Sequence, residues 1–179
     1  LARGDYVWIA EADDLCEPAF LDRAMSVLEN SDAAFVFCDS RQIDETGREL
    51  AASYQYYYKD VGGGGLDRDV ILPGPEFVRR YLSVKNVILN VSGVLWRRDA
   101  LIHALAATRD GHQSLKLASD WKMYAVAALE CGSVGFIAAP LNVHRRHAAS
   151  TTQARDGEAH YAEIVAVQEF IESRVALDK

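Results

Sequence analysis

Near the start of the chain, residues 4–14 read Gly4-Asp5-Tyr6-Val7-Trp8-Ile9-Ala10-Glu11-Ala12-Asp13-Asp14, and this segment indicates the fold most clearly. Its middle, 5–10, is a run of β-branched and aromatic residues, which is typical of a buried strand. Three carboxylates follow within four residues. Pro18 then stands where a helix is expected to begin, and apolar residues recur at helical spacing from Phe20 to Leu28. The stretch therefore predicts a strand, an acidic loop and a helix in that order.

The same kind of alternation continues along the chain. A second apolar run, 33–38, predicts another strand, and Asp44-Glu45-Thr46-Gly47 predicts a turn. Because strands and helices alternate, we expect an α/β fold, with a mixed, mainly parallel sheet flanked by helices. The remaining pattern predicts strands over 87–96 and 134–139, helices over 76–82, 98–107, 120–130 and 158–175, and a loop without a core of its own over 54–69.

The composition indicates one globular domain over 1–179. Half of the residues are hydrophobic and a quarter are charged, which permits an ordinary packed core. No apolar run is long enough to span a bilayer, and the net charge of −7 argues against nucleic-acid binding through phosphate contacts. The three cysteines form no CxxC pair, so we expect a reduced, cytoplasmic setting. Any association with the inner face of a membrane would come from other parts of the protein.

The acidic residues after the first strand form the first candidate site. Carboxylates at the carboxyl end of a strand lie where open α/β sheets bind ligands. Oxygen ligands of this kind suit Mg²⁺ or Mn²⁺, and such an ion would relieve the repulsion between them. The alternative is that Asp13 and Asp14 only cap the helix that follows.

Two further segments carry candidate functional residues. Ser119-Asp120-Trp121 begins a predicted helix, where Ser119 is expected to be the N-cap and where the helix dipole is expected to lower the pKa of Asp120. The segment from His144 to Thr152 combines cations with hydroxyl groups, which suit phosphate oxygens. The alternative for His144 and Arg146 is a solvated basic turn.

The order of these segments resembles the family-2 glycosyltransferases, which have the GT-A fold. The resemblance covers about 3–152, with 153–179 left as a C-terminal helix. It rests on the first strand and its acidic motif, on 91–98, on Ser119-Asp120-Trp121, on Gly132 to Leu141, and on the segment after it. Glu11 stands where the family usually has Asp, and Ser119 stands where it usually has Glu.

The resemblance implies a role for each candidate residue. Asp120 would be the general base, Asp13, Glu11 and His147 would hold the metal, and Mn²⁺ or Mg²⁺ would be the cofactor. The donor diphosphate would contact Asp14, Arg145 and Ser150, and the acceptor side would include Trp121, Ser92 and Gly93. The implied reaction is an inverting transfer of a sugar from a nucleotide-sugar donor to a glycan or lipid-linked acceptor, in polysaccharide or cell-surface glycan synthesis.

The family has strands and helices before the acidic motif that hold the base and ribose of the donor. The sequence begins close to that motif, so we expect a truncated, acceptor-side part of a GT-A domain that binds the donor weakly by itself. An open sheet edge would permit a homo-oligomer.

Two other classes of function fit the sequence. One is a non-catalytic sugar- or partner-binding module on the same scaffold, and the other is a metal-dependent nucleotidyl or phosphoryl transferase. The glycine run 62–65 lacks the spacing of a phosphate-binding loop and is expected to be a flexible loop. The tyrosines of 54–58 could stack on sugar rings or anchor the loop.

Overall fold

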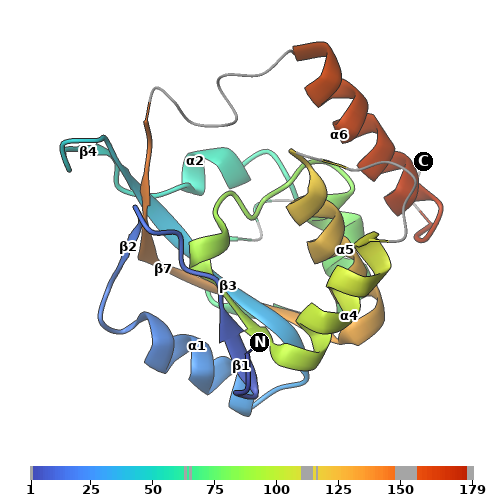
Figure 1. The fold of residues 1–179 in the computed structure, drawn as a ribbon, viewed down its shortest axis with the longest axis horizontal. Coiled ribbons are helices and arrows are strands. Elements are labelled where there is room, and N and C mark those ends of the chain that lie inside the picture. Colours follow the sequence, from blue (N-terminus) through green and yellow to red (C-terminus); the bar gives the residue numbers. More distant parts are fainter. Residues whose placement is uncertain are drawn as a thin grey trace.

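The computed structural model describes residues 2–62, 64, 66–109, 115, 117–147 and 157–176. Helices lie on both sides of one curled, mixed sheet, and the chain is therefore an α/β protein (Figure 1). Along the chain the elements are β1 (Tyr6–Trp8), β2 (Leu15–Cys16), α1 (Phe20–Glu29), β3 (Ala33–Ile43), β4 (Glu49–Ala51), α2 (Gln55–Tyr58), β5 (Val70–Leu72), α3 (Gly74–Phe77), the π-helical turn η1 (Val78–Leu82), the 3-10 turn η2 (Val91–Gly93), β6 (Val94–Arg97), α4 (Arg98–Arg109), α5 (Ser119–Cys131), β7 (Ser133–Arg145) and α6 (Gly157–Glu172).

The sheet runs in the order β1-β6-β3-β7-β2, with β4 added to β3 and β5 added to β7. Within the described residues only β3 and β7 pair in parallel, and the other pairs are antiparallel. The prediction of a mainly parallel sheet is therefore wrong. Hydrophobic patterns identify strands but not their directions, and short connections such as the turn between β3 and β4 join antiparallel neighbours.

Three strands nevertheless point the same way. β1 and β3 are each antiparallel to β6, so they run in the same direction, and β7 is parallel to β3. Their carboxyl ends consequently lie at one end of the sheet. This is the end at which open α/β sheets bind ligands.

Alternate residues of β3 enter two separate cores. Phe35 and Phe37 belong to the larger core, beneath α3, η1, α4 and α5. Val36 and Cys38 belong to a smaller core, which α1 covers with Phe20, Ala24 and Leu28. In Figure 1, α1 accordingly lies on one side of β3, and α4 and α5 lie on the other. The sheet is thus buried on both faces, which explains the nearly continuous apolar sequence of its central strand.

The segment 54–69 does not match its prediction as a loop without a core. Tyr54, Tyr58, Val61 and Leu66 are all buried within the larger core. The ring of Tyr58 lies 6.0 Å from that of Phe136 in an edge-to-face contact. The aromatic rings of the tyrosines pack beside the sheet. The polar and glycine-rich sequence of the segment gives no sign of this burial.

Two boundaries also differ from the prediction. The expected strand over 87–96 begins only at Val94, because η2 precedes it and the Asn90 side chain accepts a hydrogen bond from the Ser92 amide at 3.0 Å. Ser119 is not an N-cap. Helix α5 begins at Ser119, with Ala118 at the cap position and no side-chain cap bond. The predicted turn after β3 is confirmed, with Gly47 at φ 88°. No helix within the described ranges has the length and apolar character needed to cross a membrane.

Candidate functional site

Strand register brings the acidic segment 11–14 to the end of β7. Leu15 of β2 pairs with Val143 of β7 in an antiparallel register, so the two residues before Leu15 lie opposite the two that follow Val143. The acidic segment does not cap a helix: α1 begins only at Phe20, and no side chain caps it. The capping alternative is therefore wrong, because β2 separates the carboxylates from the helix.

Asp14 joins three segments that are distant in sequence. Its Oδ2 accepts hydrogen bonds from Asn90 Nδ2 at 2.8 Å and from Ser92 Oγ at 2.7 Å. Its Oδ1 accepts one from the backbone amide of Arg145 at 2.9 Å. With both oxygens engaged by protein donors, Asp14 organises the cluster from within. We call residues 11–14, Asn90, Ser92, Arg145 and His147 the acidic cluster.

Asp13 and His147 face each other at the surface of the acidic cluster. His147 Nε2 lies 2.5 Å from Asp13 Oδ2, and the two side chains keep 37% and 46% of their surface exposed. The hydrogen bond from His147 is the main reason why the pKa of Asp13 lies below its ordinary value. Because both side chains are partly exposed, a ligand from solution can reach either of them.

Arg145, predicted to contact the donor diphosphate, forms hydrogen bonds to the backbone, and the phosphate contact stays a prediction. Its Nε donates to the backbone oxygen of Asp13 at 2.9 Å, and a terminal nitrogen donates to the backbone oxygen of Asp44 at 3.0 Å. These bonds tie the acidic segment to the turn after β3. Arg145 thus stabilises the shape of the cluster.

Glu11 lies deeper in the cluster. Its carboxylate accepts from Asn90 Nδ2 at 3.1 Å, and its backbone amide donates to Ser92 Oγ at 3.0 Å. Partial burial, followed by the charges of Asp14 and Asp13, raises the pKa of Glu11 above its ordinary value. The three carboxylates therefore repel one another in the folded chain, as the sequence predicts.

Ser92 and Gly93, predicted on the acceptor side, lie in η2, where Ser92 belongs to the acidic cluster and Gly93 follows it. Both are buried. The polar residue that prediction missed here is Asn90, whose amide spans Glu11, Asp14, Ser92 and Asn142. In the sequence, Asn90 stands out only as the one polar residue within the apolar run 87–91. A polar side chain that is buried among such residues needs hydrogen-bond partners.

Asp120 and Trp121 line a cleft of about 440 Å³, which we call the tyrosine cleft. Its walls come from α2, from 84–89, from the start of α5, from the end of β7 and from α6, and they include Tyr54, Tyr56, Tyr57, Lys85, Arg146 and His160. Trp121 is buried and donates from its indole nitrogen to the backbone oxygen of Leu82 at 3.0 Å, so it forms part of the wall.

The expected low pKa of Asp120 is wrong. Burial raises the pKa of its carboxyl above the ordinary value, although the backbone amide of Trp121 at 2.8 Å and Asn86 Nδ2 at 3.3 Å act in the opposite direction. Desolvation of a charged group thus outweighs the helix terminus. A raised pKa makes Asp120 a stronger base once it is ionised.

Tyr54 connects the tyrosine cleft to the acidic cluster. Its hydroxyl lies 2.6 Å from His144 Nδ1. The charge of Asp14 acts on both Tyr54 and His144. Buried Asp39 holds Tyr54 in place by accepting from its backbone amide at 2.9 Å and from Ser53 Oγ at 2.5 Å. The two candidate regions are therefore adjacent parts of one site.

His144 and Arg146 do not form the solvated turn that was the alternative for them. Both are half-buried, His144 bonds Tyr54, and Arg146 lines the tyrosine cleft. Ser150, predicted to contact the diphosphate, lies outside the described residues, as does His112.

The donor set of the acidic cluster is of a kind that binds Mn²⁺ or Mg²⁺. Carboxylate oxygens and an imidazole nitrogen are available from Asp13, Glu11 and His147. Over the part of the chain that the structure describes, no group of three or more His, Cys, Asp or Glu side chains is already placed around one point. Binding of a metal would require Asp13 and His147 to turn from each other toward the ion.

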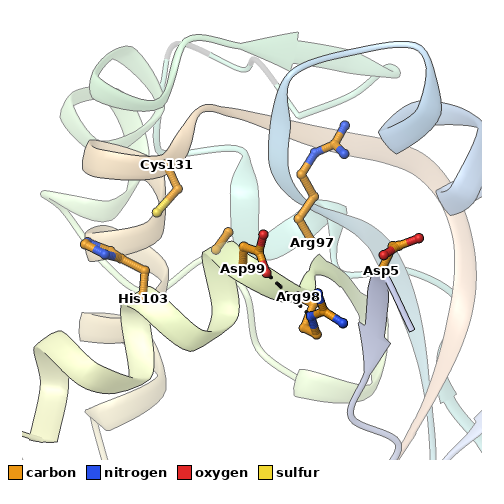
Figure 2. A pocket seen from close by; sticks show the side chains of 7 residues that line it. Asp5, Arg97, Arg98, Asp99, His103 and Cys131 are labelled. Atoms are coloured by element: carbon orange, nitrogen blue, oxygen red, sulfur yellow. Dashed lines mark hydrogen bonds and ion pairs between the residues drawn. The ribbon is translucent and has the colours of Figure 1, made fainter. Parts of the chain in front are cut away.

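A second cavity, of about 370 Å³, lies between β1, the end of β6, α4 and the end of α5. Arg98 and its neighbour in the chain, Asp99, form an ion pair at 3.4 Å, while Arg97 points away from this pair and His103 and Cys131 lie apart from it (Figure 2). Arg97 donates to the backbone oxygens of Leu28, Ser31 and Ala33, so its guanidinium stabilises the connection between α1 and β3. Among the described residues, no predicted site residue lines this second cavity, whereas Asp120 and Trp121 line the tyrosine cleft.

Comparison with models of known protein families gives no match for this chain, and comparison with curated proteins gives none either.

Proposed function

We propose that the chain belongs to an inverting, metal-assisted glycosyltransferase that moves a sugar from a nucleotide-sugar donor to an acceptor hydroxyl. The observation that carries the proposal is the adjacency of two chemically distinct regions. One offers exposed oxygen and imidazole ligands at Asp13 and His147, and the other offers the carboxylate of half-buried Asp120 within a cleft. Sugar transfer from a diphosphate needs both a cation and a base.

The proposed division of labour follows from the environment of each residue. A divalent cation held by Asp13, Glu11 and His147 would offset the charge of the departing diphosphate. Asp120 would accept the proton of the acceptor hydroxyl, because its surroundings favour the protonated form. Asp14 and Asn90 would keep the metal ligands in place, and Arg145 would do so from the opposite side.

A second candidate function is favoured by the tyrosine cleft. Exposed aromatic rings with adjacent polar groups bind sugars without any reaction. A non-catalytic sugar-binding module would use the same cleft and would not need the carboxylate of Asp120.

The test is product analysis with the longest natural chain that contains this sequence, incubated with Mn²⁺, nucleotide sugars and candidate acceptors. We expect release of a nucleoside diphosphate. Asp120→Asn should lower the rate by about 10²–10⁴-fold, the usual contribution of a general base. Asp99→Asn is the matched control, since Asp99 also lies in the first turn of a helix, and it should leave the rate unchanged.

Other products would point elsewhere. Release of pyrophosphate or phosphate would indicate a nucleotidyl or phosphoryl transferase. An Asp120→Asn variant with full biological activity would indicate the binding module.

A further inference from the structure

Among the residues that the structure describes, the tyrosine cleft contains one cation, Arg146, whose side chain has no hydrogen-bond or ion-pair partner. The backbone amide of Arg146 donates to the oxygen of Ile43 at 2.8 Å, which anchors the residue at the end of β7. Arg146 is half-buried as a residue and lines the cleft, and within the described ranges its guanidinium forms no hydrogen bond or ion pair. A partly desolvated guanidinium gains most from an oxyanion, to which it can donate two parallel hydrogen bonds.

The other charges of the cleft are already satisfied. Lys85 is paired with Asp60 at 2.9 Å and lies 3.9 Å from the ring centre of Tyr57. Asp120 accepts from Asn86 and from the backbone of Trp121. Arg146 therefore supplies the cleft with a positive charge that a ligand can use, in a chain whose net charge is −7.

The tyrosines supply a surface of the right kind for a sugar ring. Tyr56 is 55% exposed, and its hydroxyl accepts a hydrogen bond from Gln42 Nε2 at 2.8 Å. Its ring lies 6.2 Å from the ring of Tyr54, which is held by His144. Aromatic rings that are fixed in this way present flat apolar faces at a small cost in conformational entropy.

We propose that the tyrosine cleft binds a sugar that carries an oxyanion, a carboxylate or a phosphate, with Arg146 taking the oxyanion and Tyr56 the ring. This inference rests on the proposed function in one respect only, namely that the bound sugar is the acceptor of the transfer. The cleft would thus select anionic acceptors over neutral ones, because a neutral sugar leaves the guanidinium unpaired.

The experiment is an NMR titration of the chain with glucuronic acid, glucose 6-phosphate and glucose, without metal or nucleotide. Shifts of amide signals around the cleft report binding. We expect at least one anionic sugar to bind about tenfold or more tightly than glucose. Arg146→Gln should remove that preference. Arg48→Gln, which changes an exposed arginine of the turn after β3, should retain it.

Three results would overturn the inference. They are equal binding of all three sugars, no binding of any of them, and an anionic preference that survives Arg146→Gln. A fourth arm uses the longest natural chain that contains this sequence and adds UDP together with Mg²⁺ to its complex with the better anionic sugar. Displacement of that sugar by UDP would assign Arg146 to the donor diphosphate and overturn the acceptor assignment, whereas simultaneous binding would support it. Because no arm requires transfer, an anionic preference would stand even if the chain proved to be a non-catalytic module.

Discussion

Asp13 and Asp14 are neighbours in sequence with opposite environments. Asp14 accepts hydrogen bonds from Asn90, Ser92 and the backbone of Arg145, so its role is to hold the acidic cluster together. Asp13 has its charge at the surface, beside His147. Asp14 thus has a structural role, whereas Asp13 is the carboxylate that we propose as a metal ligand.

This difference predicts unequal effects on stability. Asp14→Ala leaves three donors without their acceptor and should lower the free energy of unfolding by about 2 kcal/mol. Asp13→Ala breaks one exposed pair and should cost less than about 1 kcal/mol. Urea denaturation of both variants measures the two values. Equal losses would show that the network around Asp14 does not hold the cluster.

The raised pKa of Asp120 predicts a pH dependence. A base must be ionised, and a carboxyl with a raised pKa loses its proton at a higher pH than an ordinary aspartate does. The transfer rate should therefore begin to fall, as the pH is lowered, above the range in which exposed carboxyls titrate. A rate profile at saturating substrate measures this limb. A limb at or below the ordinary aspartate pKa of about 3.9 would contradict the burial of the base.

At the scale of elements, long segments were more predictable than short ones. Helix α5 and strands β3 and β7 have enough apolar residues for their periodicity to be read. β2 has two residues and β4 and β5 have three each, too few for any pattern, and they form because a longer strand supplies their partners. Strand directions depend on connections and packing, which explains the wrong expectation of a mainly parallel sheet.

The candidate site was predictable where strand ends carry charged residues. The acidic motif and the segment 144–147 each follow a predicted strand, and they lie together because β1, β3 and β7 point the same way. Asn90 and Arg146 could not be assigned in advance. Their roles depend on the register between β1 and β6 and on where the end of β7 meets the tyrosines, and local sequence does not encode either feature.

The packing of α3 against α5 provides a test of the fold itself. A Cβ atom on Gly74 would lie 1.6 Å from the backbone oxygen of Ala128 and 2.4 Å from that of Gly132, so the two elements would have to separate. Gly74→Ala should lower the free energy of unfolding by about 3 kcal/mol.

The matched control for Gly74→Ala is Gly157→Ala. A Cβ on Gly157 meets nothing within 4 Å among the described residues, and the change should alter stability by less than about 0.5 kcal/mol. Thermal or urea denaturation compares the two variants. Equal stability of both would contradict the close approach of α3 and α5.

At the level of the whole molecule, the two candidate regions differ in charge. The acidic cluster and the tyrosine cleft are adjacent, yet one concentrates carboxylates and the other contains an unpaired guanidinium within the described residues. Tyr54 and His144 lie between them. A metal-bound donor on one side and an acceptor on the other is the arrangement that this separation favours.

The central claim is that the acidic cluster binds a nucleotide through a divalent cation. Calorimetric titration of Mn²⁺ with UDP, GDP and dTDP tests it most directly, with this chain and with the longest natural chain that contains it. We predict that the longer chain binds one nucleotide only when Mn²⁺ is present, that this chain alone binds it weakly, and that Asp13→Asn abolishes binding. If no nucleotide binds to either chain with Mn²⁺, or if Asp13→Asn binds as tightly as the unaltered protein, the acidic cluster is not a metal and donor site and the glycosyltransferase proposal fails.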